Sequence, residues 1–346
     1  MRTFFQSLLV TAVVSIVISC SNGAPEPQVI GQFDGGIFVS NEGNFGEGDG
    51  SLSFINASGN VTNQVFKEAN GYPLGDVVQS VHIDDDLLFM VVNNSNKIEV
   101  ASLEDSLYSQ YSIEDLSLPR YMTSHNGLGY VTEWVSFTEK GRVSIFDLET
   151  GSIQSSIEVG FGPEGLILAD DYLYVSNNFS TNVSVIDLDM GEVINTIEVG
   201  NAPSQMALDA EGHLWVACQG GYDDNYAPLG DGKLVELDAS TGDVLSSVEL
   251  QVNFNGKIDV SPVGDKLFFT TGNELKSINT DGAGTAELIH QFESVTSFYG
   301  LAVSKGGAVY LADAGNFTEN GKVYVILGDI LLSYSVGRGP NGFAFN

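Results

Sequence analysis

Residues 162–200 read GPEGLILADDYLYVSNNFSTNVSVIDLDMGEVINTIEVG and contain one complete structural unit. Four short apolar runs, rich in Val, Ile and Tyr, are separated by Asp, Asn and Gly. This pattern is typical of β-strands joined by tight turns, and each run is too short for a typical amphipathic helix. The stretch therefore predicts a four-stranded antiparallel sheet with strands A to D at Gly165–Ala169, Tyr172–Ser176, Val183–Asp187 and Val193–Val199.

The same unit recurs along the whole chain. The residue that ends strand B returns at intervals of 52, 40, 44, 41, 53 and 42 residues. A four-stranded unit repeated every ~40–50 residues is the signature of a propeller blade. We therefore expect an all-β, seven-bladed β-propeller with four antiparallel strands per blade. The seven positions are Asn41, Asn93, Glu133, Asn177, Cys218, Thr271 and Asp313.

The two ends of the repeat array predict how the ring closes. Residues 36–66 supply strands B, C and D but no strand A, whereas the final residues Pro340–Asn346 resemble a strand A alone. We expect the C-terminal strand to join the N-terminal blade, which hides two sheet edges. Blades stacked in a ring behave as one domain, so residues 36–346 are predicted to form a single propeller. An array of β-sandwiches is the alternative.

The first 19 residues are interpreted as a lipoprotein signal peptide. Arg2 is their only charge, and the apolar run from Leu8 to Ile18 is too short to span a bilayer. The sequence VISC (17–20) resembles a bacterial lipobox, which implies cleavage before Cys20 and lipidation of that residue. Residues 20–35 would then be a lipidated cysteine with a polar tether, and two or more acyl chains anchor stably. A secretory signal with a chance cysteine is the alternative.

The charge of the chain excludes one class of function. Asp and Glu number 45 against 13 Lys and Arg, giving a net charge of −32. Such a surface repels nucleic acid and a bare anionic membrane, while 43% hydrophobic residues argue against disorder. Cys218 is the only cysteine besides Cys20, so no disulfide within the mature chain is expected, and its apolar run predicts that it is buried.

The connectivity of a blade sorts its loops onto two faces. Because each antiparallel turn reverses the chain, the A–B and C–D turns lie on one face, and the B–C and D–A loops lie on the other. The first face carries short, often acidic turns such as Asp170-Asp171. The second face carries longer loops rich in amides and aromatic rings, which suggests a binding surface. Several of these rings are expected only to pack between loops.

The sequence shows little of the chemistry that enzymes use. The four histidines, at positions 82, 125, 213 and 290, fall in different blades, so we predict no metal site and expect each to be structural or exposed. There is no Gly-rich phosphate loop, HExxH or GxSxG element. Acids are so abundant that any one acid–base pair is weakly indicated. A neutral or cationic ligand with an apolar body suits this chain better, and we expect it not to be an enzyme.

Several segments resemble a known family. The unit at 162–200 is similar to YncE-like (YVTN-type) propellers, and GIFVSNEGNFG (36–46), LPRYM (118–122) and GPNGFAFN (339–346) resemble the BtuG-type surface lipoproteins that capture cobalamin. The resemblance implies a corrinoid bound noncovalently over the propeller axis, a TonB-dependent outer-membrane transporter as partner, and attachment to the outer membrane at the cell surface through the lipid alone. One departure is that no acid directly follows Cys20, which leaves the leaflet open.

We expect the ligand to be held by loop residues of the second face. Arginines and amides would serve as donors, Asp313 as an acceptor and the rings as packing surface. Two alternatives stay open: an enzyme of the lyase or lactonase kind, with a metal or an acid–base pair at the axis, and a protein-docking propeller without a small ligand. The candidate residues are Asn41, Asn44, Phe45, Tyr72, Asn93, Arg120, Tyr121, Trp134, Asn177, Phe179, Tyr222, Tyr226, Tyr299, Asp313 and Arg338.

Overall fold

The computed structural model describes residues 31–223, 225–252, 254–281 and 285–346. Residues 32–346 form the unit described below. The expected signal peptide and the expected lipidation site at Cys20 lie outside the described residues. Within the described ranges, no helix is long and apolar enough to cross a membrane.

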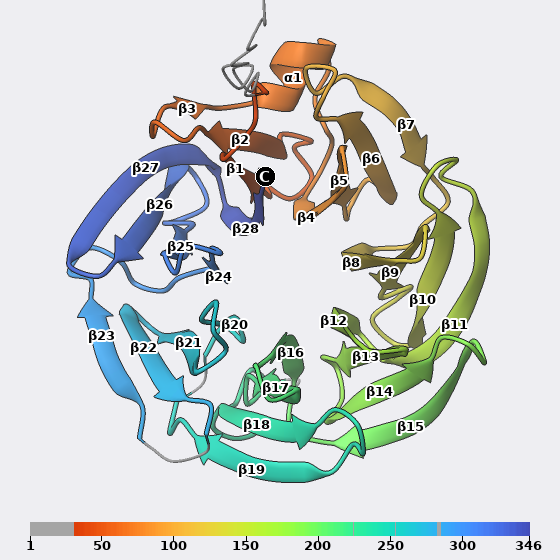
Figure 1. Ribbon diagram of the computed structural model, residues 1–346, viewed down its shortest axis with the longest axis vertical. Coiled ribbons are helices and arrows are strands. Elements are labelled where there is room, and N and C mark those ends of the chain that lie inside the picture. The colour runs from red at the N-terminus through yellow and green to blue at the C-terminus, as the bar shows by residue number, and fades with distance from the viewer. Residues whose placement is uncertain (1–30, 224, 253, 282–284) are drawn as a thin grey trace, which may run out of the picture. The chain divides into compact units, whose positions relative to one another are not determined.

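Seven four-stranded antiparallel sheets are arranged in a ring in the described part of the chain (Figure 1). From strand A nearest the axis to strand D at the rim, blade 1 contains β28 (Pro340–Phe345), β1 (Ile37–Asn41), β2 (Ser51–Ile55) and β3 (Val61–Thr62). Blades 2 and 3 contain β4 (Val78–Asp84), β5 (Leu87–Val92), β6 (Lys97–Ser102), β7 (Ser109–Ile113), β8 (Pro119–His125), β9 (Leu128–Glu133), β10 (Lys140–Asp147) and β11 (Ile153–Phe161).

The remaining four blades follow in the same A-to-D order. Blades 4 and 5 contain β12 (Pro163–Ala169), β13 (Tyr172–Asn177), β14 (Asn182–Asp187), β15 (Glu192–Glu198), β16 (Pro203–Leu208), β17 (His213–Cys218), β18 (Lys233–Asp238) and β19 (Val244–Glu249). Blades 6 and 7 contain β20 (Ile258–Val260), β21 (Lys266–Thr271), β22 (Glu274–Asn279), β23 (Glu287–Gln291), β24 (Gly300–Val303), β25 (Val309–Asp313), β26 (Asn320–Leu327) and β27 (Ile330–Arg338).

This architecture confirms the predicted seven-bladed propeller. Six of the seven B strands end at the predicted residue, and β5 ends one residue earlier, at Val92. The C-terminal β28 pairs antiparallel with β1, with Val39 opposite Phe343, and so closes the ring as expected. The outer strand of blade 1 is the exception, because β3 has only two residues.

A short helix corrects the expectation that the folded part contains only strands and loops. Helix α1 (Val65–Asn70) follows β3 where a longer strand D was predicted. Its Phe66 is fully buried in the cluster between blades 1 and 2, and Gly71, at φ 80°, ends it in the left-handed conformation that glycine tolerates. Six residues are too few for a helical period to be visible in the sequence.

The core lies between blades. Seven clusters of buried apolar side chains each join two neighbouring sheets, including the pair that closes the ring. Phe89 of blade 2, for example, meets Phe146 of blade 3 at a centroid distance of 6.3 Å. Cys218 is buried in one of these clusters, as predicted, and burial raises the pKa of its thiol to about 12. The thiol therefore stays protonated at neutral pH and is not an activated nucleophile.

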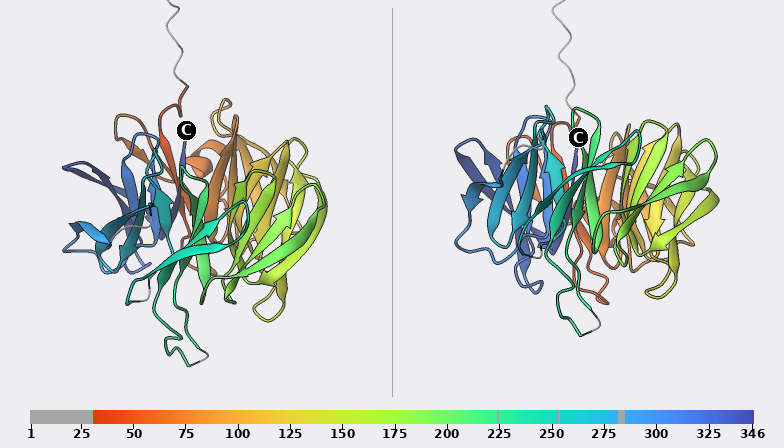
Figure 2. Two further views of the ribbon diagram at one scale, coloured as in Figure 1. Left: turned by 60° about the horizontal axis from the view of Figure 1, so that its bottom comes forward. Right: turned by 90° about the horizontal axis from the view of Figure 1, so that it is seen from below.

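The two faces of the ring carry different loops. The B–C loop of blade 5, between β17 and β18, projects from one face, whereas the C-terminus lies at the other (Figure 2). The first is the face of the B–C and D–A loops, and we call it the loop face. It is the face on which the sequence placed the candidate ligand residues.

Candidate functional site

A repeated backbone irregularity brings polar side chains to the axis at the loop face. In five blades, the pairing register between strands A and B shifts within the first residues of strand A. These five A strands begin at Val78, Pro119, Pro163, Pro203 and Pro340. Such bulges re-aim the side chains beside them. The residue after each of these positions lines one pocket over the axis. The five residues are Gln79, Arg120, Glu164, Ser204 and Asn341.

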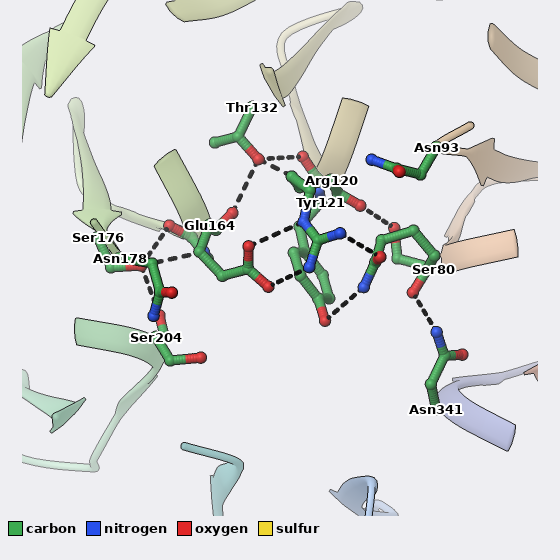
Figure 3. A network of polar contacts seen from close by, with 12 residues as sticks. Ser80, Asn93, Arg120, Tyr121, Thr132, Glu164, Ser176, Asn178, Ser204 and Asn341 are labelled. Atoms are coloured by element: carbon green, nitrogen blue, oxygen red, sulfur yellow. Dashed lines mark hydrogen bonds and ion pairs between the residues drawn. The ribbon is translucent and has the colours of Figure 1, made fainter. Parts of the chain in front are cut away.

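The strongest contact among these five is an ion pair between neighbouring blades. Arg120 Nε and Nη2 each donate to Glu164 at 2.8 Å, and Nη1 donates to Gln79 Oε1 at 2.5 Å (Figure 3). The two charged side chains are 14% and 8% exposed. The pKa of Arg120 is raised, because its attraction and hydrogen bonds to Glu164 outweigh the opposing effect of burial. Bidentate pairing holds both groups in fixed orientations.

The other blades add two more polar groups to the axis. Lys257 Nζ lies 2.6 Å from the Tyr121 hydroxyl oxygen and makes no ion pair within the described residues. On another side, the Tyr299 hydroxyl donates to Glu42 at 3.1 Å, and Asn341 Nδ2 donates to the same carboxylate at 2.9 Å. The floor of the site therefore presents both donors and acceptors, with cationic and acidic groups interleaved.

Burial raises the pKa values of Glu42 and Tyr299, which meet on this floor. Desolvation raises the pKa of Glu42, although hydrogen bonds from Asn341 and Tyr299 and the charges of Arg120 and Lys257 act against it. Desolvation and the neighbouring Glu42 raise the pKa of Tyr299. Tyr299 is therefore a neutral donor at physiological pH, and Glu42 binds a proton more readily than an exposed glutamate does.

An aromatic wall stands beside the polar floor. Trp134 meets Phe179 at a centroid distance of 4.7 Å and Phe137 at 5.6 Å, and the Arg120 guanidinium lies 4.1 Å from the Trp134 ring centroid. Gly162, at φ 59°, makes room for this wall, because a Cβ there would lie 2.5 Å from Phe179 ring carbons. Exposed rings held in fixed positions are a preformed apolar surface.

Three hollows join into one site at the loop face. The axial pocket, of about 240 Å³, is lined by Glu42, Gln79, Arg120, Trp134, Glu164, Asn178, Ser204, Gln219, Asn255, Lys257, Tyr299 and Asn341. The aromatic pocket, of about 560 Å³, shares five of these residues and adds Gly43, Asn44, Phe45, Val77, Asn93, Asn94, Leu118, Phe137 and Phe317. A third hollow, of about 390 Å³, shares Gln219 and Asn255 with the axial pocket and continues to Tyr222.

The structure brings about half of the sequence-predicted residues to this site. Six line the axial or aromatic pocket and a seventh lines the third hollow: Asn44, Phe45, Asn93, Arg120, Trp134, Tyr299 and Tyr222. Tyr121 and Phe179 line none of the three hollows, but each contacts a residue that does. Tyr121 contacts Lys257, and Phe179 contacts Trp134.

The remaining candidates are placed elsewhere. Asn41 and Asn177 are fully buried, and their amides hydrogen-bond within their own blades, to Ser53 and Ser184. Tyr72 donates to Glu99, Asp313 accepts from the Gly315 amide, Arg338 pairs with Asp49, and Tyr226 is exposed in the B–C loop of blade 5. None of these six lines the three hollows.

Sequence reasoning missed most of the polar floor. Gln79, Glu164, Ser204 and Asn341 were not among the candidates, because each lies within strand A and not in a loop of aromatic and amide residues. Lys257, which directly precedes β20, was missed as well. One signal was available: four of the blades begin strand A with proline, and the residue after each proline faces the axis.

The lining of the three hollows combines apolar rings with polar groups. The residues that line the three hollows include Trp, Tyr and Phe rings, amides and two cations, but no histidine and no cysteine. The Glu42–Tyr299 pair is one acid–base feature of the floor. A bulky ligand could rest its apolar part on the aromatic wall and direct its polar groups to the floor.

Comparison with known proteins supports the fold. The family model described as "Domain of unknown function (DUF5074)" matches residues 35–241, more than half of the chain. No curated protein sequence matches. Similar solved structures include a putative 6-phosphogluconolactonase from Bacteroides fragilis (TM-score 0.64, 13% identity, 91% of this chain and 99% of that one). Another is virginiamycin B lyase from Staphylococcus aureus (TM-score 0.60, 16% identity, 78% of this chain and 88% of that one). At such identities the likeness shows the fold alone.

Proposed function

The chain belongs to the DUF5074 family, and we propose that it is a capture protein that binds a bulky cofactor of the corrinoid class, such as cobalamin, on its loop face. The observation that carries the proposal is the pairing of an aromatic wall with an amide-rich polar floor in one site over the axis. A corrinoid combines an apolar ring edge with peripheral amides, so each part of the ligand has a counterpart here.

The polar floor is suited to ligand amides and to one anionic group. Gln79, Asn255 and Asn341 carry both a donor and an acceptor, and all three line the axial pocket. Lys257 contributes a cation that forms no ion pair within the described residues, although its charge acts on the nearby Glu42. The Trp134 indole Nε1 is a buried donor without a partner in the described part of the chain, and an acceptor on a ligand would satisfy it.

Preorganisation is the expected mechanism of tight binding. The Arg120–Glu164 pair, the Trp134–Phe179 contact and the five strand-A bulges fix the floor and wall before the ligand arrives. Little conformational entropy is then lost on binding, so more of the contact energy appears as affinity. We further propose that the chain is lipid-anchored through Cys20 at the outer-membrane surface and passes its ligand to a TonB-dependent transporter.

A second candidate is a propeller enzyme of the lyase or lactonase kind. The buried Glu42 with its raised pKa, beside Tyr299, is the observation that favours it, because perturbed groups in a cleft are often catalytic. Solved lyase and lactonase propellers share the fold. One of the lyase structures is described as a catalytically inactive histidine-to-alanine variant, whereas no histidine lines the hollows of this chain. We therefore favour capture.

Isothermal titration of the purified protein with cyanocobalamin tests capture. We expect a stoichiometry of one and a loss of at least tenfold in affinity for Trp134→Ala, since buried aromatic anchors carry much of a binding energy. Tyr108→Ala is the matched control, because Tyr108 is exposed but lines none of the three hollows. Absence of heat at micromolar protein, or equal weakening by both variants, would contradict the proposal. Chemical change of the recovered ligand would favour the enzyme.

A further inference from the structure

We propose that Asp209, His213 and Glu236 form a divalent-metal site in blade 5, on the face opposite the three hollows, and that Zn²⁺ suits it best. Asp209 lies in the A–B turn, His213 begins β17, and Glu236 lies in β18 opposite Trp215. The site is separate from the proposed ligand site, because the A–B turn and the loop face lie at opposite ends of strand B.

The spacing of the three donor atoms fits one ion. His213 Nδ1 lies 2.8 Å from Glu236 Oε1 and 3.8 Å from Asp209 Oδ2, and all three atoms lie within 4.8 Å of one another. Zinc binds imidazole nitrogen and carboxylate oxygen at about 2.0–2.2 Å in tetrahedral geometry, which puts its ligands about 3.3 Å apart. Small side-chain shifts therefore suffice to enclose an ion.

The two carboxylates are buried and lack another cation. Their side chains are 1% and 7% exposed, and within the described ranges no Lys or Arg forms an ion pair with either. Buried charges require a partner, because desolvation is expensive. Two acids around one imidazole leave an excess of negative charge that a divalent cation would neutralise.

Surrounding hydrogen bonds hold the ligands in position. The Trp215 indole Nε1 donates to Asp209 Oδ2 at 3.0 Å, and the Ser246 hydroxyl donates to Glu236 Oε2 at 2.6 Å. The second bond orients the carboxylate and leaves Glu236 Oε1 directed to the histidine. Outer hydrogen bonds of this kind are typical of metal sites, where they fix the ligand orientation.

His213 offers the second, independent indication. Its Nδ1 is buried and makes no hydrogen bond of acceptable geometry, although Glu236 Oε1 is only 2.8 Å away. A bound cation would use the lone pair of this nitrogen and satisfy it. The exposed Glu211 has an oxygen 4.0 Å from the same Nδ1 and is available, as is water, for a fourth position. A bound ion would tie the A–B turn to strands B and C.

Zinc titration of purified protein without a histidine tag, stripped with EDTA and dialysed, tests the site. By calorimetry with ZnCl₂ we expect one ion per chain and a rise in the thermal unfolding midpoint. His213→Ala should abolish this binding, whereas His125→Ala, at the end of β8 in blade 3, should leave it unchanged. Ser246→Ala, which removes only an outer hydrogen bond, should weaken it about tenfold.

The outcomes separate a metal site from an ion pair between His213 and Glu236. Equal zinc binding by wild type and His213→Ala, or no zinc binding by the wild type, overturns the proposal and leaves the ion pair alone. If His213→Ala does not fold, Ser246→Ala decides: unchanged zinc affinity in that folded variant contradicts the site. If all of these variants still bind cyanocobalamin, the two sites are independent.

Discussion

Glu164→Gln removes the charge that neutralises Arg120 at the floor of the site and leaves the guanidinium buried without its partner. Breaking one side of a buried ion pair costs about 3–5 kcal/mol. Arg120 is 14% exposed and borders an open pocket, so partial hydration should reduce the cost. We therefore expect the free energy of unfolding to fall by about 2–3 kcal/mol, measured by urea denaturation followed by tryptophan fluorescence.

A double variant separates the pair from its surroundings. Arg120→Met with Glu164→Met replaces both charges by apolar groups of similar length, and such replacements are often nearly neutral. We expect a free energy of unfolding within about 1 kcal/mol of wild type, hence a strong coupling in the double-mutant cycle. The control is Glu158→Gln, which breaks the exposed pair with Lys140 and should cost less than about 1 kcal/mol. If Glu164→Gln cost no more than this control, the buried pair would not organise the floor.

Two further predictions concern the aromatic wall and the pH response. Gly162→Ala places a Cβ 2.5 Å from Phe179 ring carbons at φ 59°, so the aromatic wall must shift and cyanocobalamin affinity should fall about tenfold. Gly191 is the control, because it also has a positive φ but no atom lies within 4 Å of an added Cβ. Gly191→Ala should leave the affinity unchanged in the same calorimetry. Burial raises the pKa of Asp259 from 3.8 to about 6, so the folded state binds more protons than the unfolded state between these values. The free energy of unfolding should then fall by up to about 3 kcal/mol as pH rises from about 4 to 6. In denaturation experiments at several pH values, Asp259→Asn should flatten that decline. If the variant lost stability with pH as steeply as the wild type, the assignment to Asp259 would be contradicted.

The fold was predictable because each blade repeats the same local signals. Alternating strands and tight turns recur at nearly constant spacing, and the unpaired strand A at Pro340 had only one possible partner. Helix α1 was not predictable, because its six residues are fixed by burial of Phe66 against the next blade and not by a helical period.

The candidate site was predictable only in its rings and face. Trp134 and Tyr299 stood out as rings in loops of one face, and the connectivity of antiparallel strands assigned that face. Glu164 did not stand out, because a bulge that appears only in three dimensions turns this strand residue toward the axis. Lys257 directly precedes β20 and carried no such signal in the sequence. Asn41 and Asn177 border the same kind of amide-rich loops as the residues that line the site. Their side chains are nevertheless buried, and their amides donate to Ser53 and Ser184 of the neighbouring strands.

The acidity of the chain is also better understood in the structure. Net charge argues against polyanionic ligands, but it does not describe the floor, where Arg120 and Lys257 alternate with Glu42 and Glu164. The ligand would meet balanced charges and amides there, while the small acidic turns lie on the opposite face. One of those turns includes Asp209 of the proposed zinc site.

A crystal structure of the protein grown with saturating cyanocobalamin tests the central claim most directly. The proposal predicts the corrin ring over the axis at the loop face, with its edge on Trp134 and Phe137 and its amides toward Gln79 and Asn341. Ligand density on the opposite face, or empty hollows in crystals grown with the ligand, would contradict it.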